Sequence, residues 1–311
     1  MASRLHPELA RARFIPRIPI TSRLFRLIPV RRPKALPVPD DFTVDEVSTE
    51  RDGGGMVSMR VYRPTTLPTG GPALFWMNGG GYIGGTLEQE EFRHYAFARE
   101  LGITVVAVRY RVAPAHPSPA AIEDAYAGLK WVFEHADERG IDPTRIAIGG
   151  DSAGGGLAAA LALFAHDRGE VHPAFQLLVY PMLDDRTVAR TNHDTRGALI
   201  WQPADNRRGW SAYLGVTPGS SGVSAYAAPA RREDLAGLPP AWIGVGTLDV
   251  FHDEDVEYAR RLVEAGVPCE LKVVDGAFHG FDALFQDAQV VRDFHASQVT
   301  ALRAALSRRT G

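Results

Sequence analysis

Cysteine is nearly absent from this sequence, in which Cys269 is the only one among 311 residues. A single cysteine cannot form an intramolecular disulfide, and it excludes a zinc site built from several cysteines. Long apolar runs are also missing, since no segment approaches the roughly 18 apolar residues that mark a membrane-spanning helix. The first residues lack the apolar core of a secretory signal. These absences predict a cytoplasmic protein that has no integral membrane segment and no metal site.

The chain also lacks a strong charge of either sign. Its formal net charge is −3, so nothing marks the whole chain as a nucleic-acid binder. Hydrophobic residues make up 45% and charged residues 23% of the sequence, which is ordinary for a globular protein and argues against disorder. A chain of this length forms one large α/β domain or two ordinary domains.

Apolar strand-like segments alternate with helix-like segments along most of the chain. Val44–Glu50 and Val57–Tyr62 flank a glycine turn and predict an antiparallel hairpin at a sheet edge. Further strands are expected at residues 73–77, 103–108, 175–180, 241–247 and 270–274, and another leads from a break at Asp142-Pro143 to Ser152. Helices are expected at residues 87–101, 122–133, 157–164 and 256–265, and from about Asp282 onward. This alternation predicts the α/β class, with a mostly parallel central sheet flanked by helices.

Two regions depart from the alternation. Within residues 1–45, the first 35 positions carry nine Lys or Arg against the single acid Glu8, interleaved with bulky apolar residues and prolines. Such a segment is either a mobile cap or lipid-facing surface, or a segment that packs its apolar side on the core, which we favour. Residues 185–235 predict an insertion of a few short helices outside the sheet. The catalytic core is then expected at residues 46–184 and 236–311.

Ser152 stands at the centre of the segment that we expect to carry the chemistry. The pattern Gly150-x-Ser152-x-Gly154 lies between an apolar β-branched strand and a helix rich in small residues. A strand-to-helix turn of this kind is so tight that glycines are needed two residues on either side of the serine. The turn lifts the hydroxyl clear of the sheet. We therefore predict that Ser152 is a nucleophile.

A nucleophilic serine needs a base and an acid that orients this base. His279 follows the last predicted strand between two glycine-containing loop segments, and we prefer it to His252, which follows another strand. Asp249 lies just beyond the strand that ends near Thr247. We prefer Asp249 to Asp253, Glu254 and Asp255, because it is closer to the strand end and because acids in the first turn of a helix are explained by the helix dipole. The order Ser, Asp, His is the one that hydrolases of this type use.

The negative charge that develops during acyl transfer needs fixed N–H donors. Gly79-Gly80-Gly81 follows an early strand, and only residues without a Cβ let the backbone approach a substrate so closely. We expect the donors to be Gly80 and Gly81, together with Ala153, the residue after the nucleophile.

The same glycines allow a different interpretation. Gly79-x-Gly81-x-x-Gly84 matches a dinucleotide-binding pattern after a strand. The acid usually found about 20 residues later is missing, although Arg109 and Arg111 are suited to a 2′-phosphate. An NADP-dependent oxidoreductase is therefore an alternative, but it leaves the serine turn and its partners unexplained.

Four motifs, with Ala121–Tyr126 between them, follow one another in an order that resembles one known family. They are Asn78–Tyr82 (NGGGY), Tyr110–Pro114 (YRVAP), Gly150–Gly155 (GDSAGG) and His279–Phe281 (HGF). Over roughly residues 45 to 305, the chain is similar to the hormone-sensitive-lipase-like (bacterial family IV) esterases. The resemblance implies an α/β-hydrolase fold, a cap built from the N-terminal segment and the insertion, and hydrolysis of carboxylic esters without a cofactor.

The resemblance also assigns the site residues, and it agrees with the choices made from the chain itself. The triad is Ser152, Asp249 and His279, and the oxyanion donors are Gly80, Gly81 and Ala153. One position departs from the family pattern, since Asn78 stands where a histidine usually supports the glycine loop. An amide can both donate and accept a hydrogen bond, so we expect Asn78 to support the loop.

Substrate preference and partners are less directly encoded. Small esters with short to medium acyl chains are expected, and aromatic residues that are candidates to line the pocket are Tyr82, Trp201, Trp210, Tyr213 and Phe14. Core packing of these rings within the cap is the competing interpretation. An amidase or deacetylase uses the same triad, and a non-catalytic receptor uses the same fold. A homodimer also stays open.

Overall fold

The computed structural model describes residues 5–16, 34–190 and 198–307. Within these ranges, eight strands form one sheet in the order β1-β2-β4-β3-β5-β6-β7-β8. The strands are β1 (Phe42–Glu50), β2 (Met56–Pro64), β3 (Gly71–Met77), β4 (Thr104–Arg109), β5 (Ile141–Asp151), β6 (Phe175–Val179), β7 (Ala241–Gly246) and β8 (Cys269–Val274). The predicted α/β class is confirmed.

The sheet is parallel except at one edge. β1 and β2 form the predicted antiparallel hairpin, in register from Phe42 opposite Pro64 to Glu50 opposite Met56, and β2 is antiparallel to β4. All later neighbours, from β4 through β3 to β8, run parallel. The loops that follow the parallel strands therefore emerge at one edge of the sheet, where open α/β sheets place their ligands.

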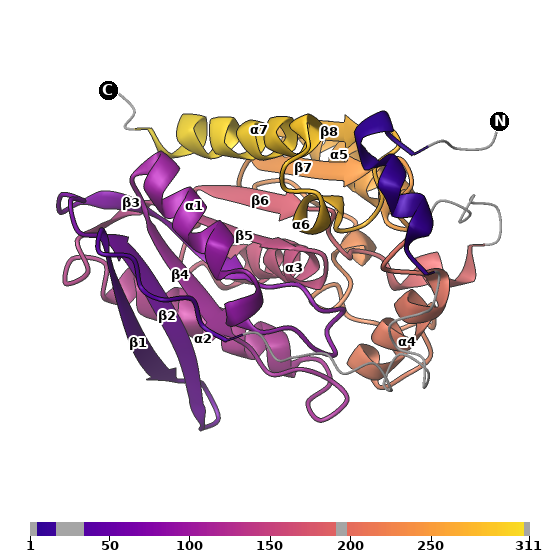
Figure 1. Ribbon diagram of the computed structural model, residues 1–311. Coiled ribbons are helices and arrows are strands. Elements are labelled where there is room, and N and C mark those ends of the chain that lie inside the picture. Colours follow the sequence, from indigo (N-terminus) through magenta and orange to yellow (C-terminus); the bar gives the residue numbers. More distant parts are fainter. Residues whose placement is uncertain (1–4, 17–33, 191–197, 308–311) are drawn as a thin grey trace.

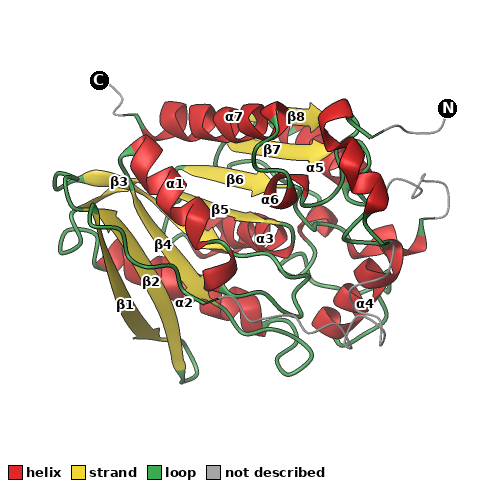
Figure 2. Ribbon diagram, in the orientation of Figure 1, coloured by secondary structure: helices red, strands yellow, loops and turns green. Residues whose placement is uncertain are grey.

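Helices cover both faces of the sheet (Figures 1 and 2). α1 (Glu91–Leu101) and α7 (Gln289–Leu306) pack on one face, whereas α2 (Ala120–Glu134), α3 (Ala153–Arg168) and α5 (His252–Glu264) pack on the other. α3 is made mainly of glycine, alanine and leucine and is buried almost all round, as expected for a helix that is apolar on every side. This central helix begins directly at the serine turn.

Several expected boundaries were wrong. The helix expected at residues 87–101 is divided into the short 3-10 helix η3 (Leu87–Gln89) and α1. The break expected at Asp142-Pro143 is an irregularity inside β5: the register jumps from Gly71–Ile141 to Ala73–Ile146, and the Asp142 side chain accepts the N–H of Thr144 in a local turn. α5 begins at His252 and not at Val256, because the acidic first turn complements the helix dipole.

The terminal helix is divided into α6 (Phe281–Leu284) and α7. Phe285 and Ala288 leave helical backbone angles between these two helices, and the ring of Phe285 packs edge-on against Phe278.

The described N-terminal residues 5–16 and the described helices of the insertion lie beyond the carboxyl ends of the parallel strands (Figure 1). The insertion contains the expected short helices, η4 (Asp185–Ala189), α4 (Pro203–Leu214) and η6 (Pro229–Arg231). Near the N-terminus, η1 (Pro7–Phe14) buries Leu9 and Ala12 and leaves its arginines exposed, so this described part packs on the core.

The remaining basic and apolar residues of the N-terminal segment, 17–33, lie outside the described residues, so the choice between a packed segment and a mobile cap stays a prediction for them. No helix in the described ranges is both long enough and apolar enough to cross a membrane.

Candidate active site

The serine turn is the tightest connection at the carboxyl edge of the sheet. Ser152 joins β5 to α3 with a φ of +54°, a left-handed conformation that costs a non-glycine residue free energy. A Cβ at Gly150 would overlap the backbone of Gly154 and the carbonyl of Met77. A Cβ at Gly154 would overlap the carbonyls of Met77 and Asn78. Both flanking positions therefore exclude any side chain, because of these backbone contacts as well as because of the sharpness of the turn.

Three residues that are far apart in the sequence meet at this turn. Ser152 Oγ lies 2.9 Å from His279 Nε2, and His279 Nδ1 lies 2.8 Å from Asp249 Oδ2. His279 comes from the loop after β8, and Asp249 comes from the loop after β7. Each side chain is nearly buried, with 6% to 7% of each residue exposed. The arrangement joins a hydroxyl, an imidazole and a carboxylate in one hydrogen-bonded line.

Asp249 is held on its other side as well, since Asp249 Oδ1 accepts the N–H of Phe251. The side chains of Tyr180 and Phe251 pack edge-on against the His279 ring at centroid distances of 4.8 and 5.2 Å. These contacts limit the rotation of both the carboxylate and the imidazole. The imidazole is thus oriented by packing and by hydrogen bonding together.

The rival acids and the rival histidine point elsewhere. Asp253 lies 2.9 Å from His252, and both are at the surface end of α5. Glu254 accepts the N–H groups of Leu183 and Asp184, and burial raises its pKa to about 8. Burial also raises the pKa of Asp255, whose two oxygens have no partner among the described residues. None of these four residues takes part in the hydrogen-bonded line at Ser152.

The glycine loop lies next to the serine turn because β3 and β5 are paired neighbours. Met77, at the end of β3, is the register partner of Gly150. Gly80 and Gly81 have φ values of +132° and +60°, and a Cβ at Gly80 would overlap the backbone of Gly84. The backbone N–H groups of Gly80, Gly81 and Ala153 donate no hydrogen bond in the turns, loops and helix caps of the described residues. These N–H groups are suited to an acceptor supplied by a ligand.

Asn78 and Glu90 both support this loop. The Asn78 amide donates to the carbonyl of Gly79 at 2.9 Å, and its backbone carbonyl accepts the Tyr110 hydroxyl at 2.6 Å. Glu90 Oε1 accepts the N–H of Gly79 at 3.0 Å. Glu90 is not predicted from the sequence, because acids at the start of a helix are explained by the helix dipole alone. No local signal in the chain distinguishes it.

The predicted pocket aromatics pack closely around the glycine loop. Tyr82 stacks on Tyr213 with a centroid distance of 3.8 Å and an interplanar angle of 6°, and Trp210 lies 5.7 Å from Tyr82. Trp201 lies so near the loop that a Cβ at Gly81 would overlap its ring. All four aromatic residues are buried, and Phe14 is 73% exposed. The rings join the insertion to the loop, and their role in lining a substrate pocket stays a prediction.

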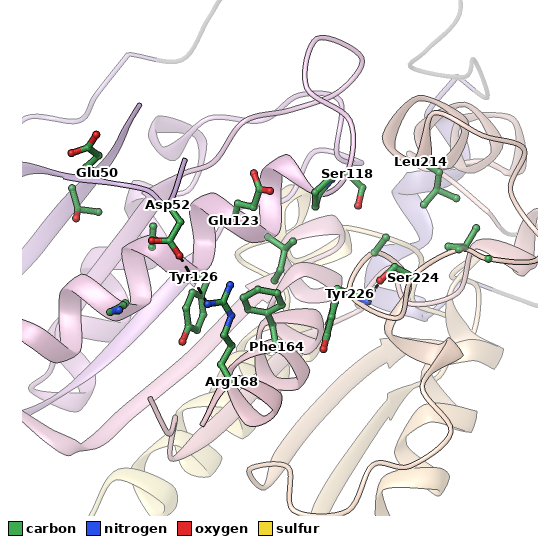
Figure 3. A pocket seen from close by; sticks show the side chains of 18 of the residues that line it. Glu50, Asp52, Ser118, Glu123, Tyr126, Phe164, Arg168, Leu214, Ser224 and Tyr226 are labelled. Carbon is green, nitrogen blue, oxygen red and sulfur yellow. Dashed lines mark hydrogen bonds and ion pairs between the residues drawn. The ribbon is translucent and has the colours of Figure 1, made fainter. Parts of the chain in front are cut away.

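A wide cavity lies away from this site. It has a volume of about 790 Å³ and is bounded by the β1–β2 turn, α2, α3 and residues 214–227 (Figure 3). The guanidinium of Arg168 lies over the rings of Tyr126 and Phe164 on its wall. None of the triad residues lines the cavity, so its size carries no information on the ester pocket.

The arginines required for an NADP site are already paired. Arg109 donates to Glu88 at 2.6 Å, and Arg111 donates to Asp124 at 2.8 Å. A 2′-phosphate would have to displace these carboxylates from both guanidinium groups. The dinucleotide alternative therefore loses its proposed phosphate contacts. No cluster of three or more potential metal-ligating side chains occurs in the described part of the chain.

Comparisons with known proteins agree with the fold. The family model described as alpha/beta hydrolase fold matches residues 74–283. The chain is 37% identical over 230 residues to "Esterase LipI" of Mycobacterium tuberculosis, covering 73% of this chain and 71% of the relative. It is 32% identical over 241 residues to "Ethyl acetate hydrolase" of Pseudomonas putida, covering 76% and 75%.

Among solved structures, "Bacterial Heroin Esterase" superposes with a TM-score of 0.89 at 38% identity, covering 98% of both chains. The match covers almost the whole of both molecules, so it extends beyond the serine turn to the insertion and the N-terminal segment. The chain therefore belongs to the hormone-sensitive-lipase-like (bacterial family IV) esterases of the α/β-hydrolase fold, and it is a carboxylesterase.

Proposed function

We propose that this carboxylesterase acts through an acyl-enzyme formed on Ser152, with His279 as the base and Asp249 as its partner. The observation that carries the proposal is the continuous line from Ser152 Oγ through His279 to Asp249, with contacts of 2.9 and 2.8 Å. The Nδ1–H of His279 donates to Asp249, which leaves Nε2 free to accept the serine proton. The substrate is a small carboxylic ester.

In the first step, Ser152 Oγ attacks the ester carbonyl carbon while its proton passes to His279 Nε2. The carbonyl oxygen becomes an oxyanion, and the N–H groups of Gly80, Gly81 and Ala153 donate to it. The tetrahedral intermediate collapses, and His279 returns the proton to the departing alcohol. The imidazolium that forms in between is stabilised by the carboxylate of Asp249.

In the second step, water attacks the acyl-serine and His279 again takes the proton. Collapse of the second tetrahedral intermediate restores the Ser152 hydroxyl and releases the carboxylic acid. The two steps consume one ester and one water and yield one alcohol and one acid. None of them requires a cofactor.

A serine-directed fluorophosphonate tests the proposed nucleophile. Wild-type protein should be labelled once, on the peptide that contains Ser152, and Ser152→Ala and His279→Ala should both lose the label. The non-catalytic receptor and the oxidoreductase alternatives predict no labelling. Labelling that persists in Ser152→Ala would place the nucleophile at another residue.

The acyl pocket is proposed to take short to medium chains, under a cap formed by the N-terminal segment 1–45 and the insertion 185–235. Support comes from the buried rings of Trp201, Trp210 and Tyr213, which crowd the glycine loop. A second support is that one relative is named for hydrolysis of ethyl acetate. In this proposal, the aromatic rings of the insertion leave little room for a long acyl chain.

The chain-length preference is tested with p-nitrophenyl esters from acetate to palmitate. We expect kcat/KM to be highest between acetate and octanoate and to fall for longer acyl chains. The corresponding acetanilide tests the amidase alternative. It should be hydrolysed far more slowly than p-nitrophenyl acetate. A maximum at palmitate would contradict the short-chain proposal and favour a lipase.

Replacing Asn78 with histidine should keep kcat within about tenfold of wild type. The reason is that histidine Nδ1 occupies nearly the position of the Asn78 amide nitrogen, so it can donate to the Gly79 carbonyl in the same way. The measurement is kcat on p-nitrophenyl acetate, with the unfolding temperature as the control. Complete loss of activity in a folded variant would mean that the Asn78 amide has a second role.

Two further predictions concern the assembly and its location. We propose a cytoplasmic enzyme, in line with the single Cys269, and we leave open a homodimer. Light scattering of the purified full chain measures the oligomeric state directly.

A further inference from the structure

Behind the glycine loop lies a group of ionisable side chains that the proposed chemistry does not use. Three of them are carboxyl groups, on Glu90, Asp151 and Asp282, and one is the guanidinium of Arg93. Glu90, Arg93 and Asp282 are each at most 9% exposed, and Asp151 is partly buried, with its Oδ1 atom buried. Three carboxylates around one guanidinium would leave uncompensated negative charge in a medium of low polarity.

Arg93 is committed mainly to one of these carboxyl groups. Both of its terminal nitrogens donate to Asp282 Oδ2 at 3.1 Å, and Asp282 Oδ1 accepts the Tyr180 hydroxyl at 2.7 Å. Arg93 and Asp282 thereby form a closed ion pair. Of the two remaining carboxyl groups, Glu90 and Asp151, at most one is therefore expected to be ionised.

Glu90 and Asp151 both lie against Gly79. The N–H of Gly79 donates to Glu90 Oε1 at 3.0 Å, and a Cβ on Gly79 would lie only 3.1 Å from both oxygens of Asp151. Glu90 Oε2 accepts the indole N–H of Trp76 at 2.7 Å. The two carboxyl groups thus enclose the first residue of the glycine loop, one from the residue that precedes α1 and the other from the end of β5.

The electrostatics of this pair are those of two carboxyl groups that cannot both be ionised. Burial raises the pKa of Glu90 well above its ordinary value, and the charge of Asp151 raises it further. Burial raises the pKa of Asp151 as well, but Arg93 and a hydrogen bond from Glu90 oppose this effect. These directions make Glu90 the member of the pair that keeps its proton more strongly.

The other groups that face the pair do not replace this proton. Tyr110, from the loop after β4, and Tyr180, from the loop after β6, are buried, and burial raises the pKa of both phenols well above the ordinary value. Both stay neutral, and both hydroxyls donate to other acceptors, Asn78 O and Asp282 Oδ1. Arg93 is the cation that faces the pair.

We propose that Glu90 is a positioning residue for the oxyanion hole: Glu90 and Asp151 share one proton, and the bridged pair clamps Gly79 so that Gly80 and Gly81 present their N–H groups to the oxyanion. Asp151 directly precedes Ser152, so the clamp ties the loop to the serine turn itself. This inference rests on the proposed function, because it concerns the same acyl transfer. Labelling of wild-type Ser152 by fluorophosphonate tests that function separately.

The test compares Glu90→Ala with Glu90→Gln. Alanine removes the clamp, so kcat on p-nitrophenyl acetate should fall by about 10²-fold while KM changes little. The inhibition constant of a methyl trifluoromethyl ketone, which forms an oxyanion on the serine, should rise by a similar factor. Glutamine is a neutral donor to Asp151 and keeps an acceptor for Gly79, and it loses only the acceptor for the Trp76 indole N–H, so it should keep kcat within about tenfold.

Glu91→Gln is the matched control. Glu91 is the next residue on α1 and is also a buried acid, but its carboxylate accepts from Arg60 and from the Tyr62 hydroxyl. Its loss should lower the unfolding temperature and leave kcat and the ketone inhibition constant within about threefold of wild type. If Glu90 acts on the oxyanion hole, its alanine variant loses kcat, whereas the Glu91 variant loses only stability.

Two results would overturn the proposal. A loss of less than tenfold in Glu90→Ala means that Glu90 does not position the loop, and an equal loss in the glutamine and alanine variants means that a shared proton is not what holds it. Should Glu90→Ala fail to fold, infrared spectra of wild type and Glu90→Gln still decide the matter. In the difference between these two spectra at neutral pH, wild type should show one more carbonyl band of a protonated carboxyl group beside those of Glu254 and Asp255, and the absence of this additional band refutes the shared proton.

Discussion

Replacing Ser152 with alanine should lower kcat toward p-nitrophenyl acetate by about 10⁶-fold, with little change in the unfolding temperature. Alanine keeps the Cβ of the tight turn, so the strained backbone at φ +54° is not altered further. Only the hydroxyl that lies 2.9 Å from His279 Nε2 is lost. The remaining rate over water then comes from the oxyanion donors and from substrate binding alone.

A double variant makes this result more specific. Ser152→Ala combined with His279→Ala should be hardly slower than Ser152→Ala alone, because the two residues act as one unit. Two independent contributions would instead multiply. Activity of Ser152→Ala above about one thousandth of wild type would refute the assignment of the nucleophile.

Asp249→Asn should lower kcat by about 10⁴-fold while KM stays within a small factor of wild type. The asparagine amide has the shape of the carboxylate, so His279 can remain in place. It can however donate a hydrogen to Nδ1, which favours the tautomer whose Nε2 carries the proton and cannot accept the serine proton. It also removes the charge that stabilises the imidazolium, at a contact of 2.8 Å.

Asp253→Asn is the control for this charge change. Asp253 lies four residues further along, is exposed and contacts His252 and Arg190 without reaching the triad. Its replacement should leave kcat within about twofold of wild type, since exposed ion pairs contribute little. An effect of similar size in the two variants would mean that His279 uses another acid.

The buried ionisable group behind the glycine loop also explains why a difference at Asn78 need not disable the site. In the sequence, Asn78 is a departure from a family motif, and nothing local says whether the loop is still held. In the fold, Gly79 is contacted by Asn78 at its carbonyl and by Glu90 at its N–H. Two supports from different elements are less sensitive to one substitution than a single support would be.

Much of the fold could be predicted because its signals are local. The edge hairpin was visible as two alternating runs around glycines, and α2 was visible as apolar residues three and four positions apart. Two of the errors occurred where contacts outside the segment decide the outcome. Asp142-Pro143 stays within β5 because β3 and β5 pair on both sides of the irregularity. Phe285 ends α6 and packs against Phe278 from the preceding loop.

The sequence by itself determined the class of fold, the serine turn and the order of the three triad candidates, because strand periodicity, glycine requirements and chain order are properties of short segments. The tertiary structure added what separates Asp249 from the three acids within six residues of it, a contact of 2.8 Å with His279, since distance is a property of the folded chain. The role of Glu90 can be inferred only from the tertiary structure. Its role depends on burial beside Asp151, 61 positions away, and burial is what makes two carboxyl groups share one proton.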